Sequence, residues 1–364
     1  MRPSVMLQTV LLVLAVALES SGEPLRVAVA GLVHGHVGGF LRQAKDRPGV
    51  EIVGISDPDV SLHRKYRERY GLAEPLFFAD LETMLDRVRP QAVAAFTSTD
   101  EHPVVVAACA RRRLPVMMEK PLAVSMEHAR AISRAAGESG IPVIVNYETT
   151  WYRSHAALWA LVKQERAFGE VRRMVAMDGH EGPQEIRVPP EFFAWLTDPV
   201  KDGAGALYDF GCYGANLMTW LMDGARPLSV SAVTKRIKPA IYPRVDDDAT
   251  VLVDYAGAQG VIEASWNWPF GRKDLEVYGQ TGYGRAIGGN TLRIRRAGAK
   301  EEEAPELAER PEDERDSLAY LAAVVRGRKP DGLSSLANNL VVSEILEAAR
   351  ESARSGRTVR LGGR

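Results

Sequence analysis

The stretch Val116-Met117-Met118-Glu119-Lys120-Pro121-Leu122 marks the end of a buried strand in this 364-residue chain. Three apolar residues are followed by an acid–lysine pair and then by a proline. Proline fixes φ and has no backbone N–H, so Pro121 predicts a turn where Glu119 and Lys120 emerge. A lysine at the carboxyl end of a parallel strand lies where open α/β sheets bind their ligands. Taken alone, Lys120 is better explained as a solvated surface charge, so the surrounding chain decides its role.

On both sides of this stretch, short apolar runs alternate with amphipathic ones. The expected strands cover residues 25–30, 52–56, 92–96 and 142–146. One expected helix ends near residue 45, and four others cover 60–70, 81–88, 104–112 and 126–138. This alternation predicts right-handed βαβ units and a parallel sheet. The carboxyl ends of parallel strands share one edge, so Gly31, Asp57, Thr97, Lys120 and Asn146 are expected to meet there.

The turn after the first strand is rich in glycine and precedes a helix. Its sequence is Gly31-Leu32-Val33-His34-Gly35-His36. Such a turn offers backbone N–H groups to a pyrophosphate, and Asp57, which closes the second strand, is placed to hold a ribose hydroxyl. Val33 and His36 stand where G-x-G-x-x-G has its second and third glycines, so the turn alone is a weak signal. Together with Asp57 and the strand rhythm, it favours a dinucleotide site.

Two carboxylates bear on which dinucleotide is bound. A 2′-phosphate beside Asp57 and Asp59 would be repelled, so NAD is expected, with NADP as the alternative. His34 and His36 form a His-x-His pair, a spacing that occurs in metal sites. No acidic or cysteine partner stands near them in the sequence, so no metal site is expected.

Composition excludes several classes of protein. With a net charge of −1, the chain lacks the excess of positive charge that is typical of proteins that bind nucleic acid or an anionic membrane. Two cysteines, Cys109 and Cys212, are too few for a disulfide-rich scaffold or a cysteine-built metal site. Residues 1–22 have the layout of a secretory signal peptide, which predicts a periplasmic or other extracytoplasmic protein, with an uncleaved N-terminal anchor as the alternative.

The second half of the chain has a different pattern. Several strands joined by short glycine-containing turns predict a largely antiparallel sheet. They cover residues 171–178, 228–236, 250–255, 261–268, 275–279 and 291–295, with helices at 151–164, 317–326 and 336–353 and a surface loop at 300–316. The boundaries drawn from this change are 24–146 for the first domain and 147–364 for the second.

Residues 203–222 predict a glycine loop that leads into a helix. Asp209, Tyr213 and Asn216 stand at helical spacing and are expected to form one polar stripe. If Lys120 is not considered, a purely structural hydrogen bond between Asp209 and Tyr213 explains the pattern equally well.

After residue 22 the chain resembles the Gfo/Idh/MocA oxidoreductases over nearly its whole length. The resemblance rests on Glu119-Lys120-Pro121, on His102 at the start of the helix after the fourth strand, and on Asp209-x-x-x-Tyr213-x-x-Asn216. It implies an α/β fold, with an N-terminal Rossmann dinucleotide-binding domain and a C-terminal α+β domain that binds substrate and joins subunits through its sheet. Many members have His where this chain has Tyr213, and tyrosine there looks like the glucose–fructose oxidoreductase branch.

The resemblance and the residue chemistry together assign roles. Oxidation of an alcohol carbon requires removal of the hydroxyl proton, and a nearby ammonium favours a phenolate. The expected catalytic residues are Lys120, Tyr213 and Asp209. The expected cofactor-binding residues are Gly31, Val33, His34, Gly35, His36, Asp57, Thr97, Ser98, His102, Glu119, Lys120 and Asn146. The expected substrate-binding residues are Lys120, Glu148, Tyr152, Arg153, His180, Asp209 and Tyr213.

These features predict an exported NAD(P)-dependent oxidoreductase that acts on a sugar, a sugar derivative or a cyclic polyol and assembles as a homo-oligomer. One alternative is an NAD-dependent glycoside hydrolase that uses transient oxidation, which would release an aglycone without net NADH. The other is a non-catalytic member of the fold that binds sugar or dinucleotide, which any turnover would exclude.

Overall fold

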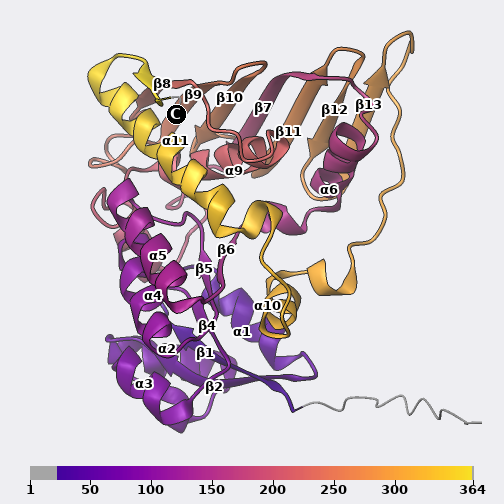
Figure 1. Ribbon diagram of the computed structural model, residues 1–364. Helices are drawn as coiled ribbons and strands as arrows, with labels where there is room; N and C mark the ends of the chain where they lie inside the picture. The colour runs from indigo at the N-terminus through magenta and orange to yellow at the C-terminus, as the bar shows by residue number, and fades with distance from the viewer. Residues whose placement is uncertain (1–22, 363–364) are drawn as a thin grey trace, which may run out of the picture.

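The protein has two β-sheets with helices packed around and between them (Figure 1). The computed structural model describes residues 23–362, so the expected signal peptide at 1–22 lies outside the described residues. In Figure 1 the sheet of the first half lies below the sheet of the second half.

The lower sheet has six parallel strands in the order β3-β2-β1-β4-β5-β6. The strands are β1 (Leu25–Ala30), β2 (Val50–Ser56), β3 (Phe77–Phe78), β4 (Ala92–Ala95), β5 (Val116–Glu119) and β6 (Val143–Asn146). This is the order of a doubly wound dinucleotide-binding sheet, and it reverses between β1 and β4. The predicted Rossmann architecture is therefore confirmed. Ligands bind such sheets in the crevice beyond the carboxyl ends of the strands at that reversal.

Helices cover both faces of this sheet. One face carries α3 (Leu81–Val88), α4 (His102–Arg111) and α5 (Met126–Ser139), and the other carries α1 (Val37–Lys45), α2 (Val60–Tyr70) and α10 (Ser317–Val325). The last of these comes from the C-terminal half of the chain. Leu318 and Leu321 are fully buried in the same core as Val27 and Val29, so α10 belongs to the helical layer on this face of the sheet.

The helices begin and end where the sequence supplies caps. Asp59 Oδ1 accepts a hydrogen bond from the backbone N–H of Ser61 at the start of α2, at 2.8 Å. Helices α2 and α5 end at Gly71 and Gly140, which have φ values of 64° and 71°. Glycine adopts this left-handed conformation without a steric penalty.

The upper sheet has eight strands in the order β13-β12-β11-β7-β10-β9-β8-β14. They are β7 (Val171–Gly179), β8 (Ser229–Lys235), β9 (Asp248–Asp254), β10 (Gln259–Ser265), β11 (Arg272–Gly279), β12 (Gly282–Ile287), β13 (Thr291–Arg296) and β14 (Val359–Arg360). Among the described strands of this sheet only β7 and β10 pair in parallel, so the prediction of a largely antiparallel sheet is confirmed.

The remaining helices lie in the C-terminal half of the chain. They are α6 (Arg153–Trp159), followed by a π-helical turn η4 (Ala160–Gln164), then α7 (Pro190–Leu196), α8 (Ala206–Asp209), α9 (Gly211–Leu221) and α11 (Leu336–Ser355). The prediction of a single helix at 151–164 is therefore wrong in detail. The observed helix starts two residues later and changes from α-helical to π-helical geometry at Ala160. The helix α7 was not predicted.

The helix predicted for 203–222 is broken at Phe210, between α8 and α9. The backbone carbonyl of Asp209 accepts hydrogen bonds from Lys120 Nζ at 2.9 Å and from Cys212 Sγ at 3.3 Å. The expected polar stripe is also wrong, because Asn216 Nδ2 donates instead to the carbonyl of Leu333 at 2.8 Å. Asn216 holds α9 to the start of α11 and has no part in the site.

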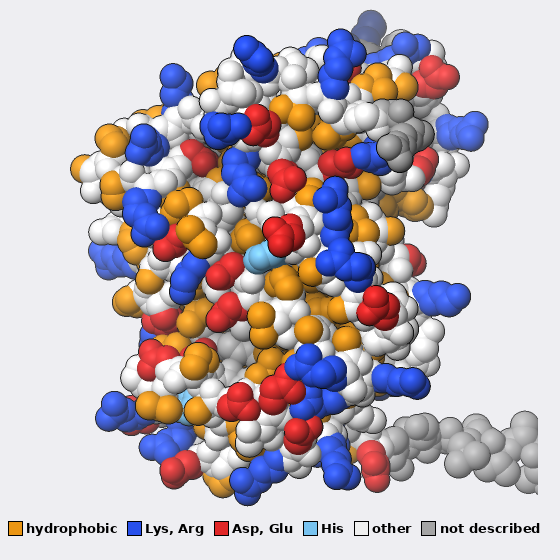
Figure 2. Space-filling view, turned by 60° about the vertical axis from the view of Figure 1, so that its left-hand side comes forward, with side chains coloured by type: hydrophobic (Ala, Val, Ile, Leu, Met, Phe, Trp, Pro, Cys, Tyr) orange, Lys and Arg blue, Asp and Glu red, His pale blue; other side chains and the backbone are white. Residues whose placement is uncertain are grey.

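The surface carries both signs of charge. Figure 2 shows Lys and Arg side chains interspersed with Asp and Glu across one face of the molecule. Within residues 23–362, none of the helices combines the length and the apolar composition that crossing a bilayer requires.

Candidate active site at the junction of the two sheets

A buried ion pair joins the two halves of the chain. Lys120, in the turn after β5, donates a hydrogen bond to the carboxylate of Asp209 at the end of α8. Both side chains are only 5% exposed. Trp266 Nε1 donates to the other carboxylate oxygen of Asp209 at 2.9 Å. The carboxylate is thereby fixed between a cation and an indole N–H.

The two members of this pair hold each other in the charged state. Burial would raise the pKa of Asp209, but the attraction of Lys120 and the hydrogen bonds from Lys120 and Trp266 keep it below its ordinary value. Burial would likewise lower the pKa of Lys120, and the attraction of Asp209 raises it instead. At neutral pH the site therefore contains an ammonium and a carboxylate in contact.

Tyr213 lies beside this pair with ammonium groups over its ring. Lys120 Nζ and Lys273 Nζ are each 5.2 Å from the ring centroid. Burial raises the pKa of the Tyr213 phenol well above its ordinary value. The expectation that Lys120 favours a phenolate is therefore wrong, because the cation contacts the ring and burial dominates. Tyr213 is a neutral phenol, able to donate its proton in a hydrogen bond.

The site also contains two residues that the sequence did not indicate. Lys273, on β11, donates to Glu148 Oε2 at 2.8 Å, and Glu148 in turn accepts from the Tyr152 hydroxyl. Asp178, on β7, stands opposite Lys273 in the strand register. It is fully buried, and neither of its carboxylate oxygens has a hydrogen-bond partner among the described residues.

Burial raises the pKa of Asp178 well above its ordinary value, which favours the neutral carboxyl. A buried carboxyl without a partner is costly in a structural core and typical of a functional site. The only signal for Asp178 and Lys273 is their cross-strand pairing, which joins strands about 95 positions apart in the sequence.

His180 follows β7 and has a defined tautomer. Its Nδ1 accepts a hydrogen bond from the backbone N–H of Gly182 at 2.9 Å. In a neutral ring the proton therefore resides on Nε2. Burial lowers the pKa of His180, although the carboxylate of Asp209 opposes this shift. His180 consequently offers an N–H donor to the site.

The glycine turn after β1 fits a dinucleotide. Gly31 has φ 87°, and a Cβ there would lie 2.7 Å from the backbone nitrogen of Thr97, so only glycine fits. Asp57 is buried, with Oδ2 accepting from the backbone N–H of Leu32 at 2.7 Å and Oδ1 from that of Asp59 at 2.8 Å. The carboxylate thus fixes the turn that leads into α1, where a pyrophosphate would lie.

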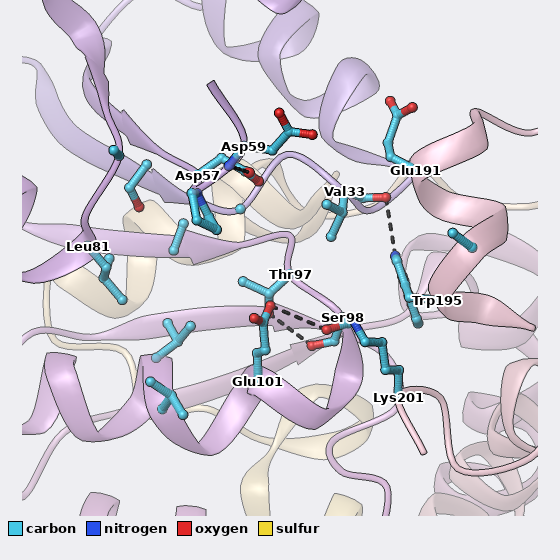
Figure 3. A pocket seen from close by; sticks show the side chains of 18 of the residues that line it. Val33, Asp57, Asp59, Leu81, Thr97, Ser98, Glu101, Glu191, Trp195 and Lys201 are labelled. Carbon is cyan, nitrogen blue, oxygen red and sulfur yellow. Dashed lines mark hydrogen bonds between the residues drawn. The ribbon is translucent and has the colours of Figure 1, made fainter. Parts of the chain in front are cut away.

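A cavity of about 480 Å³ opens beside this turn (Figure 3). Asp57, Thr97 and Ser98 line it from the lower sheet, and Val33 lines it from the glycine turn. Its charged lining consists of one lysine and five carboxylates, namely Lys201, Asp57, Asp59, Glu101, Glu191 and Asp198. An additional phosphate would be repelled here, which favours NAD over NADP.

The unpredicted helix α7 closes this cavity from the other half of the chain. Trp195 Nε1 donates to the carbonyl of Val33 at 3.2 Å, as Figure 3 shows, and Lys65 Nζ donates to Glu191 at 2.6 Å. The backbone N–H of Asp100 donates to the carbonyl of Lys201 at 3.1 Å. We call residues 190–202 the clasp, because they bind the lower half from three sides of the cavity.

The histidines of the glycine turn lie near the Glu-Lys-Pro turn. His36 Nδ1 is 3.0 Å from Glu119 Oε2, and Asn146 Nδ2 donates to Glu119 Oε1 at 2.7 Å. The expectation that His34 and His36 have no acidic partner is therefore wrong, since Glu119 comes close only in the folded chain. Ligand atoms of His34, His36 and Glu119 lie within 4.8 Å of one another.

The Nδ1 atoms of both histidines and the two oxygens of Glu119 are engaged in hydrogen bonds, whereas His34 Nε2 has no partner among the described residues. His34 Nδ1 accepts from the backbone N–H of His36 at 3.2 Å, which leaves the proton on the other ring nitrogen. A protonated ring nitrogen does not bind a metal, so the cluster suits hydrogen bonding to a cofactor better than metal coordination.

Two other expected residues have different surroundings. His102 Nδ1 is hydrogen-bonded to the carbonyl of Leu122 at 3.1 Å, so it supports the Glu-Lys-Pro turn from beneath. Arg153 contacts Glu309 and Asn290, and these contacts do not bring it to the group around Lys120.

Comparisons with known proteins agree with this geometry. Residues 25–147 match a family model described as an oxidoreductase family with an NAD-binding Rossmann fold. Residues 155–285 match the model of the GFO/IDH/MocA C-terminal domain.

Individual relatives are distant but cover most of the chain. The chain is 24% identical over 333 residues to D-apiose dehydrogenase of Rhizobium rhizogenes, covering 87% of this chain and 92% of that protein. GenD2 from gentamicin A biosynthesis, solved in complex with NAD, is 25% identical with a TM-score of 0.76 over 94% of this chain and 97% of its own. The aldose-aldose oxidoreductase of Caulobacter crescentus, at 20% identity, superposes with a TM-score of 0.77 over 93% and 100% of the two chains.

Proposed function

The chain belongs to the GFO/IDH/MocA family of NAD-binding oxidoreductases, and from that premise we propose that it oxidises a hydroxyl carbon of a sugar, a sugar derivative or a cyclic polyol. The observation that carries the proposal is the buried Lys120–Asp209 pair beside Tyr213, at the junction of the cofactor turn and the second sheet. The D-apiose dehydrogenase relative supports a polyhydroxylated substrate.

The bound nicotinamide supplies the hydride acceptor. Lys120 donates a hydrogen bond to the substrate oxygen and stabilises the negative charge that develops on it. Asp209 is the ionised carboxylate in contact with Lys120, so Lys120 passes a proton to Asp209 as it takes up the proton of the hydroxyl group. Tyr213 donates a second hydrogen bond from its neutral phenol.

The other groups of the site suit a substrate with several hydroxyl groups. Lys273 offers an ammonium over the Tyr213 ring, and Asp178 offers a carboxyl opposite Lys273 in the strand register. His180 offers an N–H donor and packs against Phe210, which stacks on Tyr213. A polyol both donates and accepts hydrogen bonds, so it can use each of these groups. We assign Asp178 and Lys273 to substrate binding, together with His180 and Glu148.

The proposal extends to location and assembly. The signal-like pattern of residues 1–22 supports export from the cytoplasm. The exposed face of the eight-stranded sheet, which carries Val233 and Leu252, supports a homo-oligomer formed through that sheet.

The test is a steady-state assay of NADH formation with a panel of aldoses, aldonates and inositols. Lys120→Met and Tyr213→Phe should each lower kcat by about two orders of magnitude while the protein stays folded. Arg153→Met is the matched control, since Arg153 lies outside the site, and it should retain normal turnover. Near-normal kcat in folded Tyr213→Phe would show that the hydrogen bond from the Tyr213 phenol does not contribute to the reaction.

One observation favours a second candidate function. The neutral carboxyl of Asp178 has the protonation state of a general acid, which an NAD-dependent glycoside hydrolase would need for its leaving group. The products distinguish the two functions. Released aglycone without net NADH supports hydrolysis, whereas an oxidised sugar with stoichiometric NADH supports the dehydrogenase. Turnover of either kind excludes a purely binding protein.

A further inference from the structure

A groove of about 540 Å³ lies between the α6–η4 segment and residues 310–334, and its lining is separate from the group around Lys120. One wall of the groove is aromatic. Trp159 and Trp220 stack with ring centroids 5.1 Å apart and planes 7° apart, and Trp151 packs on Tyr320 at 5.6 Å. Three of the six tryptophans of the chain therefore line this one groove.

The facing wall is a network of paired charges. Glu314 accepts hydrogen bonds from Arg310, at 2.6 Å, and from Arg328. Asp331 accepts from the Tyr320 hydroxyl at 2.8 Å and lies 3.5 Å from Arg328. The groove lining thus has two guanidinium groups and two carboxylates, with both cations already paired. This balance favours a neutral ligand, because an anion would meet two carboxylates and no free cation.

Polar atoms of the lining still lack partners. Ser334 is 1% exposed, and its hydroxyl has no hydrogen-bond partner among the described residues. The same holds for the Thr150 hydroxyl, Trp159 Nε1 and Arg310 Nε. Buried polar atoms are almost always satisfied by protein, by ordered water or by a ligand. Hydroxyls both donate and accept, while the two N–H groups donate, so a ligand with many hydroxyl groups would satisfy all four.

We propose that this groove binds a neutral carbohydrate ring at a site distinct from the catalytic one. The aromatic wall offers flat apolar surface to the C–H face of a sugar, and the unpartnered atoms offer hydrogen bonds to its hydroxyl groups. A purely apolar ligand would leave Ser334 and Thr150 unsatisfied, and a phosphorylated one would be repelled. The proposal does not depend on hydride transfer.

The experiment titrates the full-length protein with glucose, maltose, cellobiose, xylobiose and glucuronate while following tryptophan fluorescence. At least one neutral sugar should quench the fluorescence, and glucuronate should bind about tenfold more weakly. Ser334→Ala should weaken sugar binding about five- to tenfold. The same change should leave Tm unchanged or higher, because the hydroxyl has no partner to lose.

Two controls separate this site from others. Ser343→Ala removes a buried hydroxyl that bonds the carbonyl of Asn339 at 2.9 Å, and it should leave sugar binding unchanged. Lys120→Met should also retain it. The proposal is overturned if no neutral sugar changes the fluorescence, or if folded Ser334→Ala binds as tightly as the parent. Loss of binding in Lys120→Met alone would likewise overturn it, because the sugar would then lie in the catalytic site.

Discussion

The buried pair of Lys120 and Asp209 allows a quantitative prediction for Asp209→Asn. The substitution keeps the shape of the side chain and removes its charge, which leaves a 5% exposed ammonium without a counter-ion. Removing one partner of a buried pair costs about 3–5 kcal/mol. Unfolding entropy is about 2.1 cal/mol/K per residue, and over the 340 described residues the cost lowers Tm by roughly 4–7 °C.

The same variant should acquire a pH dependence of stability in addition to that of the parent. In the parent, the raised pKa of Lys120 contributes stability below pH 10.5 and the lowered pKa of Asp209 contributes it above pH 3.8, so stability from the pair is constant between them. Without Asp209, burial lowers the pKa of Lys120 below its ordinary value. The unfolded state then binds more protons, and stability rises as the pH increases from neutral towards 10.

The assay is thermal and denaturant unfolding at several pH values, with kcat measured in parallel. Asp178→Asn is the matched control, since that carboxyl is equally buried but neutral and without a partner. It should not lower stability at neutral pH, because the carboxyl of Asp178 must take up a proton on folding and the amide need not. Lys120→Met combined with Asp209→Asn should regain most of the lost stability. The reasoning is refuted if Asp209→Asn costs no more than Asp178→Asn, or if its stability does not vary with pH.

Three further predictions concern the cofactor and the site. NAD should bind the apoprotein at least tenfold more tightly than NADP in a titration, and Asp57→Ala should narrow that ratio; a clear NADP preference would contradict the acidic lining. The dinucleotide should copurify with the protein and dissociate slowly. In stopped-flow fluorescence, Glu191→Gln should speed its dissociation up to about fivefold and Trp195→Phe about tenfold. The surface control Glu82→Gln should have no effect on the dissociation rate. His180→Gln, which keeps an N–H donor, should retain at least a tenth of the parental kcat with an unchanged pH profile, and a lost acidic limb would instead make His180 the base.

Much of the lower half could be predicted because its signals are local. The apolar run at Val116 and the proline at 121 are neighbours in the chain, and the alternation of strands and helices is visible within any 30-residue window. The short strand β3 has two residues, too few to show a period. The clasp begins at Pro190, directly after Pro189, and two adjacent prolines predict a loop rather than a helix.

The site was harder to predict because its contacts are remote in sequence. Glu119 meets His36 across 83 positions, and Lys120 meets Asp209 across 89. Asp178 reaches Lys273 only through the register of β7 and β11. The break after Asp209 depends on a lysine from the other half of the chain, so helical spacing within 203–222 could not reveal it.

The return of α10 to the lower sheet has a mechanical consequence. The polypeptide passes between the two halves near residue 147, again before Ser317, and a third time between Val325 and Leu336. Covalent crossings at three places leave little freedom for sliding or twisting, so opening of the clasp is confined to a hinge whose axis passes near the crossings. A fragment that stops at residue 146 would lack Leu318 and Leu321 and would expose part of the core to which they belong with Val27 and Val29. Such a fragment should aggregate, and the nucleotide-binding half is therefore not an independently portable module.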